Sequence, residues 1–507
     1  MTARREELLR ILGEQAPGRR VLGIGPGADA DAPELARSGF TVTVLDVRNG
    51  FAPWTAGEID AAVCAGRRDG DRETDRRRLL RRIREHLVPG GVLVIDADGE
   101  TGLERSLRRC GFAAEPAAEP AAEPAGGASE WLVARALPHP PGSLAVADWG
   151  TPADAQLDLR YADDEAPWLD PSPREVWQDA VRSAEAGGAD LIAGYPVYDP
   201  YGGVRGADAV GRHFGHRFAP HQVTFAAGVT SLLHDLGGLA DGGPIAAPAL
   251  VHPDLETWAV ADGAELHVID GPLDHARLAE AVRDLRPALL HLDRPTFTAE
   301  VLALDELEDL ARIAAAAGTV ILIDEAPAPY LGPEGSAAGL VGRADNLVVL
   351  RGFTKAYSWG GLRGGFALAS EGVAGRVREL VTPLQMGELA FEAALRLLAA
   401  GDVFGKLRAR IHQVKPAFAD RVAADGLDVI RGHPDIPWIV VRDEDGAATR
   451  FFHERGIRGL RPVAGPVASP RQAGLLHLTV PLSDERIALF EKLASHREED
   501  RADDDGR

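Results

Sequence analysis

Short apolar segments alternate with helical segments along residues 170–380, and this alternation constrains the fold most strongly. Apolar runs such as 321–324 and 348–350 are followed by small or polar residues and then by a stretch of helical pattern. Neighbouring strands joined in this way run parallel, and their crossover connections are right-handed. The pattern therefore predicts an α/β fold built on a mostly parallel sheet.

Composition excludes several classes of protein. The chain has 507 residues, enough for two or three domains, and it is 45% hydrophobic and 26% charged, as soluble globular proteins are. Its net charge of -22 argues against nucleic acid or an anionic membrane as partner. Two cysteines are too few for a disulfide framework. Without a membrane-length apolar run or a signal peptide's apolar core, we expect a cytoplasmic protein.

Low-complexity and charged stretches divide the chain. Residues 114–127 repeat Ala, Glu and Pro and cannot bury a core, so they are expected to form a surface excursion. Proline and glycine near residue 140 indicate a linker. The predicted parts are a first domain over 1–138, a linker over 139–152, a second domain over 153–495 whose smaller portion spans about 410–495, and a disordered charged tail over 496–507.

The first domain begins with a strand that runs into a glycine turn containing Gly23, Gly25 and Gly27, and its next strand ends in Asp46. Rossmann-like folds hold an adenosine ribose with such a turn and acid. The spacing resembles S-adenosylmethionine (SAM) methyltransferases, as does the Pro-Gly-Gly turn within residues 87–96. However, Gly23 replaces an acid that is usual in that family, and one strand is missing. We expect a truncated structural relic, with a residual SAM site or an active methyltransferase as alternatives.

Residues 348–366 carry the clearest chemical signal. An apolar strand leads to a hydroxyl, Thr354, an amine, Lys355, and an arginine, Arg363, flanked by glycines. A pyridoxal 5′-phosphate (PLP) site needs a lysine for the imine, with a hydroxyl and an arginine for the phosphate. The segment resembles the Ser/Thr-Lys-x-x-x-x-Gly-Leu-Arg-x-Gly signature of fold type I aminotransferases, in particular the histidinol-phosphate aminotransferase branch.

Two upstream segments keep the chain order of that family, and the resemblance covers about residues 155–495. Asp324 ends a buried strand and matches the aspartate that pairs with the pyridine nitrogen, which keeps the ring protonated. A strand, a glycine turn and a helix start give the matching phosphate turn, because free amides at a helix N-terminus bind phosphate. The residues of this turn are Gly228, Val229 and Thr230.

Several positions depart from the family pattern. His252 falls where the family has the aromatic ring that stacks on the cofactor, and it is also a candidate proton carrier. Arg294 replaces the asparagine that in the family donates a hydrogen bond to the phenolic oxygen of the cofactor. His477 replaces the arginine that in the family binds the substrate carboxylate with two hydrogen bonds. We expect Arg294 to face the cofactor as well as the substrate, and His477 to face the substrate. Tyr195 fits the slot that reaches across a dimer to the partner's phosphate.

The resemblance implies a large domain with helices on both faces of its sheet, a small α+β C-terminal domain, and a homodimer. It implies an enzyme that forms a Lys355 aldimine and a quinonoid carbanion on a small-molecule amine or amino acid, with transamination as the default. Loss of the arginine that binds the substrate carboxylate favours a bulky substrate of specialised metabolism, such as antibiotic biosynthesis. Carbon–sulfur β-elimination, decarboxylative deamination, a bifunctional methyltransferase and a PLP-sensing regulator are the alternatives. No metal is expected.

Overall fold

A computed structural model of the chain divides into two compact units, Met1–Ser143 with Thr257–Gly263, and Leu144–Glu256 with Ala264–Arg507. The division between Ser143 and Leu144 lies within the stretch that we predicted as a linker. The described residues are 3–24, 28–45, 59–64, 80, 83, 87–96, 103, 107, 112–115, 131–136, 155–161, 164–186, 199–444, 446–460 and 474–504.

The first unit contains a six-stranded sheet in the order β2-β1-β3-β4-β6-β5. Strands β1 to β4 are parallel, whereas β6 runs antiparallel to both β4 and β5. Neighbouring residues Val21 and Leu22 are both buried but belong to different apolar clusters, so both faces of the sheet are covered. The elements are α1 (Ala3–Gln15), β1 (Arg20–Ile24), α2 (Ala28–Arg37), β2 (Thr41–Leu45), β3 (Ile59–Cys64), β4 (Leu87–Asp96), β5 (Phe112–Glu115) and β6 (Trp131–Ala136).

The predicted SAM-binding residues of this unit are only partly described. Gly23 lies within β1, where it is in register with Val44 and Val63 of the two neighbouring strands. Gly25, Gly27 and Asp46 lie outside the described residues. A SAM site in the first unit therefore stays a prediction.

The second unit is built on a seven-stranded sheet in the order β10-β9-β11-β12-β13-β14-β8. Only β14 runs antiparallel to its neighbours, so the mostly parallel sheet predicted from the alternating pattern is confirmed. The strands are β8 (Val223–Ala226), β9 (Ile245–Pro248), β10 (Leu266–Ile269), β11 (Leu289–Asp293), β12 (Val320–Asp324), β13 (Leu347–Gly352) and β14 (Gly365–Ala369).

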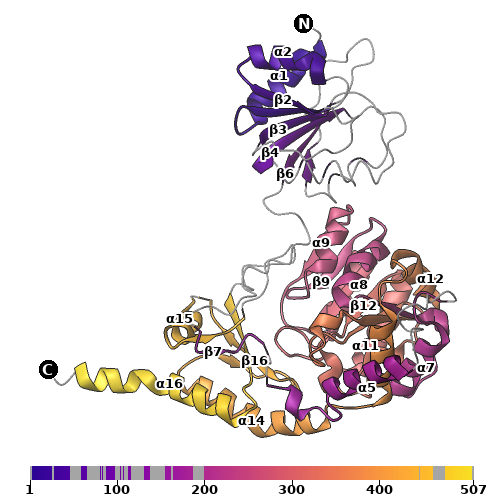
Figure 1. The fold of residues 1–507 in the computed structure, drawn as a ribbon, viewed down its shortest axis with the longest axis vertical. Helices are drawn as coiled ribbons and strands as arrows, with labels where there is room; N and C mark the ends of the chain where they lie inside the picture. Colours follow the sequence, from indigo (N-terminus) through magenta and orange to yellow (C-terminus); the bar gives the residue numbers. More distant parts are fainter. Residues whose placement is uncertain are drawn as a thin grey trace. The chain divides into compact units, whose positions relative to one another are not determined.

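Helices cover this sheet on both faces, which explains why every residue of β12, β13 and β14 is buried. One face packs on α11, whose Leu310 and Ala314 share a cluster with Ile323 and Val349, and α8 lies on the other face (Figure 1). The helices are α5 (Pro173–Ala186), α7 (Gly203–Phe214), α8 (Val229–Leu236), α9 (Asp254–Ala261), α10 (His275–Leu285), α11 (Leu304–Ala317), α12 (Glu371–Leu380) and α13 (Glu388–Ala399).

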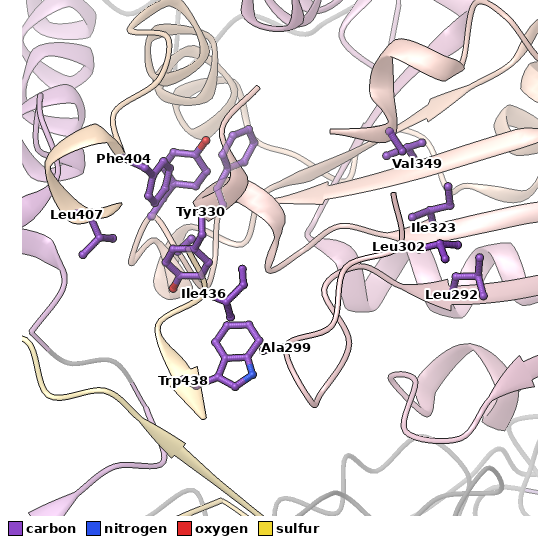
Figure 2. Close-up of a cluster of buried hydrophobic side chains, with 14 of the residues drawn as sticks. Leu292, Ala299, Leu302, Ile323, Tyr330, Val349, Phe404, Leu407, Ile436 and Trp438 are labelled. Atoms are coloured by element: carbon purple, nitrogen blue, oxygen red, sulfur yellow. The ribbon is translucent and has the colours of Figure 1, made fainter. Parts of the chain in front are cut away.

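The C-terminal part forms the predicted small α+β portion, with an antiparallel sheet in the order β15-β16-β18. Buried Tyr330, Phe404 and Trp438 join its core to that of the large sheet (Figure 2). The elements are α14 (Gly405–Ala424), β15 (Val429–Ile430), β16 (Trp438–Arg442), α15 (Ala447–Glu454), β17 (Ile457–Arg458), which pairs with β7 (Leu157–Asp158), β18 (Leu475–Thr479) and α16 (Asp484–Asp504).

Helix α16 corrects the prediction of a disordered tail from residue 496, because the helix continues to Asp504. The segment has no proline, its first glycine after Asp484 is Gly506, and glutamate, arginine and alanine favour helix. Among the described residues, no helix is both long and apolar enough to cross a membrane.

Candidate active site

The site lies at one edge of the large sheet. Strands β8, β9, β11, β12 and β13 run parallel, so their C-terminal ends meet at the same edge, where ligands bind in open α/β sheets. The segments that leave these ends carry Gly228, His252 and Lys355, and Asp324 is the last residue of β12. Residues more than 120 positions apart in sequence are brought together in this way.

A cavity at this edge has an empty volume of about 400 Å³, a figure that includes open solvent at its mouth. Most of the residues that we predicted for the cofactor line it. The lining consists of Val229, Thr230, Leu233, His252, Asp324, Ala326, Gly352, Thr354, Lys355 and Arg363.

The start of helix α8 forms one wall of the cavity. Gly228 precedes the helix with φ +102°, a conformation that favours glycine, and a Cβ there would lie 3.3 Å from Nη2 of Arg363. The first amides of a helix have no partner within it and carry partial positive charge. The amides of Val229 and Thr230 and the Arg363 guanidinium thus converge on a small region suited to an anion.

Two cations in the cavity are free to meet a ligand. Within the part of the chain that the structure describes, neither Lys355 nor Arg363 has a hydrogen-bond or ion-pair partner, although ion pairs are frequent elsewhere in this unit. Both residues are exposed. An amine and a guanidinium left unpaired on one cavity wall attract an anionic ligand and present a nucleophilic nitrogen.

Asp324 faces these cations from the end of β12. Asp324 is only 3% exposed, and its Oδ1 accepts a hydrogen bond of 2.7 Å from the amide of Ala326. Burial raises the pKa of Asp324, while the nearby Lys355 opposes the rise. A buried carboxyl group of this kind pairs readily with a positively charged ligand group.

His252 is held by its main chain. Its amide donates to Oδ2 of Asp293 at 2.9 Å, and its Nδ1 accepts a long hydrogen bond of 3.5 Å from the amide of Asp254. Burial, together with the charges of Lys355 and His291, lowers the pKa of His252 to about 3. The imidazole is therefore neutral and presents a ring that can stack on a planar ligand.

Arg294 does not face the cavity, which corrects our prediction of a direct contact with cofactor or substrate. Its Nη1 donates to Oε1 of Glu325 at 2.9 Å and its Nε to the carbonyl of Leu302 at 2.9 Å. Glu325 follows Asp324 in sequence, is fully buried, and also accepts from Arg351 at 3.1 Å. Because a buried carboxylate needs paired cations, Glu325 holds Arg294 in the interior, outside the cavity lining.

The remaining two predicted site residues are His477 and Tyr195. His477 in β18 is not among the cavity-lining residues, and its ring lies 5.5 Å from that of Phe297 and 5.4 Å from that of Trp438. Burial lowers the pKa of His477 to about 3, so it offers no positive charge for a carboxylate. Tyr195 lies outside the described residues.

Sequence reasoning missed a buried group of ionisable residues behind the cavity. Asp293 ends β11 directly beside Asp324, and His291 lies two residues earlier on the same strand. Glu256 in α9 bonds Nδ1 of His291 at 2.5 Å. The acid at the end of β11, next in the sheet to a strand that also ends in an acid, was the signal that could have revealed Asp293.

Comparison with protein families adds independent information. Residues 170–470 match the family described as aminotransferase class I and II. An aromatic amino acid aminotransferase of Cutibacterium acnes is 30% identical over 268 residues, which are 48% of this chain and 74% of that protein. A histidinol-phosphate aminotransferase of Caldanaerobacter subterraneus is 28% identical over 220 residues, 43% of this chain and 59% of that protein.

Solved structures agree on the fold. The histidinol-phosphate aminotransferase of Clostridium acetobutylicum superposes with a TM-score of 0.55 at 14% identity, covering 68% of this chain and 99% of that one. The enzyme of the same name from Sinorhizobium meliloti, solved in complex with pyridoxal-5′-phosphate, gives a TM-score of 0.53 at 19% identity, covering 67% and 90%. At these identities the likeness establishes the α/β fold shared with these aminotransferases.

Proposed function

The chain belongs to the aminotransferase class I and II family, and we propose that its cavity holds PLP on Lys355 and transforms the amino group of a small molecule. PLP, when bound, supplies an electron-accepting ring that makes bonds at the amino-bearing carbon reactive. All further steps of the proposal concern the residues of this chain.

The residues of the cavity fit this cofactor group by group. The amine of Lys355 suits the aldehyde, and Arg363, Thr354 and the amides at the start of α8 suit the phosphate. Asp324 suits the pyridine nitrogen, and the neutral ring of His252 suits the face of the pyridine. After the cofactor is bound, the freed amine of Lys355 is the group placed to move a proton at the substrate carbon.

One observation carries the proposal: Lys355 and Arg363 are cations without a protein partner in the described part of the chain, and they share a cavity with buried Asp324. A structural lysine or arginine in such a position would be expected to pair with an acid of the protein. A dianionic phosphate accounts for Arg363, an aldehyde for Lys355, and a protonated ring nitrogen for Asp324.

Reduction with borohydride tests the proposal directly, because the chain contains only four lysines. We expect the full-length protein to gain a visible absorbance band with PLP, and borohydride to abolish the band and leave the cofactor mass on the peptide that contains Lys355. Lys355→Ala should lose the trapped mass, whereas Lys406→Ala, which changes a surface lysine, should keep it. Wild-type protein without a band or a labelled peptide would contradict the proposal.

We infer further that the substrate lacks a free carboxylate beside its amine, or carries it as an ester, amide or conjugate. The family position for the carboxylate-binding arginine holds neutral His477, and Arg294 is engaged by Glu325. The aromatic amino acid aminotransferases among the relatives favour an aromatic side chain on the substrate. Specialised metabolism, in which amines and conjugates are frequent substrates, fits this site.

Paired substrates test this inference. Wild-type protein should convert an aromatic amine at least as well as the amino acid with the same side chain, and His477→Arg should shift the ratio toward the amino acid. A hydrogen bond to a charged group contributes about 1.5–3 kcal/mol, so the shift should be about tenfold to a hundredfold. His477→Gln is the control for loss of the imidazole alone. A wild-type preference for the free amino acid would overturn the inference.

The type of reaction follows from product analysis of the same incubations. Transamination is the default, and it requires a keto acid to regenerate the cofactor. Release of ammonia, thiol or carbon dioxide without a keto acid would instead establish elimination or decarboxylative deamination.

A further inference from the structure

Two strand-end acids are neighbours in the sheet: Asp324, which lines the cavity, and Asp293 on the adjacent strand. Strands β11 and β12 are parallel, and Asp293 is in register with Asp324. Residues in register on neighbouring strands direct their side chains to the same face of the sheet. Asp324 thus has a second acid as its neighbour on the face that carries the cavity.

Asp293 is connected to a chain of buried polar groups. Its Oδ2 accepts from the amide of His252, and its Oδ1 lies 3.5 Å from Nε2 of His291. Neither Oδ1 of Asp293 nor Nε2 of His291 has a hydrogen-bond partner among the described residues. On its other side, His291 bonds Glu256 at 2.5 Å, and the side chains of His291 and Glu256 are fully buried.

The surroundings of Asp293 favour the protonated form of its carboxyl group. It faces Asp324 from β12, Lys355 from the segment after β13, His291 on its own strand and Glu256 from α9. Burial and the neighbouring Asp324 raise the pKa of Asp293. Burial alone would lower the pKa of His291, but Glu256, Asp293 and Asp324 outweigh it and raise the pKa to about 9.

Protonated His291 lies 3.5 Å from Asp293, but its Nδ1 is bonded to Glu256, so its charge is shared between two acids. Lys355 is exposed, and solvent screens its charge. The neighbouring carboxyl groups of Asp293 and Asp324 therefore lack a full compensating charge, and the pair retains one proton. A positively charged ligand group beside Asp324 would compensate the second carboxylate charge, so the pair would no longer need to retain its proton. The nearby His252 is neutral and cannot supply this charge.

Resting on the proposed function, we propose that Asp293 is a positioning residue of the cofactor site, which shares one proton with Asp324 and releases it when the protonated pyridine ring binds. If the ring nitrogen arrives unprotonated, one O–H bond of the pair breaks and one N–H bond forms. If it arrives protonated, the proton leaves to solvent. The Asp293–Asp324 pair thereby loses its proton, and the positive charge of the ring compensates the carboxylate charge that results.

Proton linkage distinguishes this role from simple packing. We would titrate full-length wild type and Asp293→Asn with pyridoxamine 5′-phosphate, which does not react with Lys355, by calorimetry at pH 7 in buffers of different ionisation enthalpy. Asparagine keeps the shape but stores no proton, so wild type should take up about one proton fewer per cofactor bound than the variant. The ring contributes equally to both proteins and cancels in the difference.

Glu165→Gln is the matched control, because Glu165 is a buried carboxyl whose pKa is also raised, to about 8, but which bonds Tyr330 and is absent from the cavity lining. It should behave as wild type. Equal proton counts for wild type and Asp293→Asn would overturn the inference, whereas failure of wild type to bind PLP or pyridoxamine phosphate would overturn the proposed function itself.

Infrared spectroscopy of wild type provides a test that does not depend on the folding of Asp293→Asn. The inference requires that the difference spectrum between free and saturated protein at pH 7 show the loss of a protonated-carboxyl stretch, because the unchanged stretch of Glu165 cancels in the difference. A difference spectrum without such a loss would contradict the inference.

Discussion

Asp324 and Glu325 are adjacent in sequence, yet their carboxyl groups have separate tasks. Asp324 lines the cavity, while Glu325 gathers Arg294 and Arg351 in the interior and also bonds Ser336 and the amide of Ala337. Successive side chains at a strand end point to opposite faces, so one residue serves the ligand and the next serves the fold.

We expect Arg294→Met to act on stability and not on the cofactor. Arg294→Met leaves buried Glu325 with one cation, Arg351, instead of two. The loss in the free energy of unfolding should therefore lie at or below the lower end of the roughly 3–5 kcal/mol that a fully unpaired buried charge costs. Denaturant titration measures this loss, and the visible absorbance of PLP-loaded protein should stay unchanged. Adding Glu325→Gln should destabilise the protein further, because it leaves buried Arg351 without its carboxylate. A shifted absorbance band with normal stability would show that Arg294 reaches the cofactor after all.

At the scale of elements, the segment before α5 ties the small portion of the second unit to the large sheet. Its β7 pairs with β17, the carboxyl of Asp164 accepts from the amides of Leu482 and Ser483, and Glu165 accepts from the hydroxyl of Tyr330 at 2.7 Å. This segment, far from the C-terminus in sequence, therefore helps to hold both parts around the site.

Glu165 makes the stability of the folded protein depend on pH. Burial raises its pKa from 4.5 to about 8, so between these values the folded protein keeps a proton that the unfolded chain loses. Its contribution to stability is complete below pH 4.5 and is lost as pH rises toward 8, by up to about 1.4 kcal/mol per pH unit. Gln mimics the protonated acid. Unfolding free energies of Glu165→Gln and wild type should therefore diverge across this window, in favour of the variant, and parallel curves would contradict the assignment.

At the scale of the whole molecule, the two units have separate apolar cores. The first unit packs its own two clusters around its sheet, and the residues of the cavity all belong to the second unit. A unit with its own core is able to fold alone.

We expect deletion of residues 1–140 to leave a protein that folds and binds PLP. Its absorbance band and its affinity for the cofactor should match the full-length protein within about twofold, or about 0.4 kcal/mol. The isolated first unit, titrated with SAM, is the complementary measurement. A truncated protein that folds but no longer binds PLP would show that the first unit supports the site.

The sequence by itself determined the class of the large fold and most of the residues that line the cavity. Local patterns sufficed for this, because alternating strands and helices lead to a parallel sheet, and the motifs around Gly228, Asp324 and Lys355 follow strands whose ends meet at one edge. Only the tertiary structure decided where Arg294 points and which acid neighbours Asp324. Both depend on contacts between residues distant in sequence. Arg294 turns inward because buried Glu325 binds it, and Asp293 becomes the neighbour of Asp324 only when β11 pairs with β12.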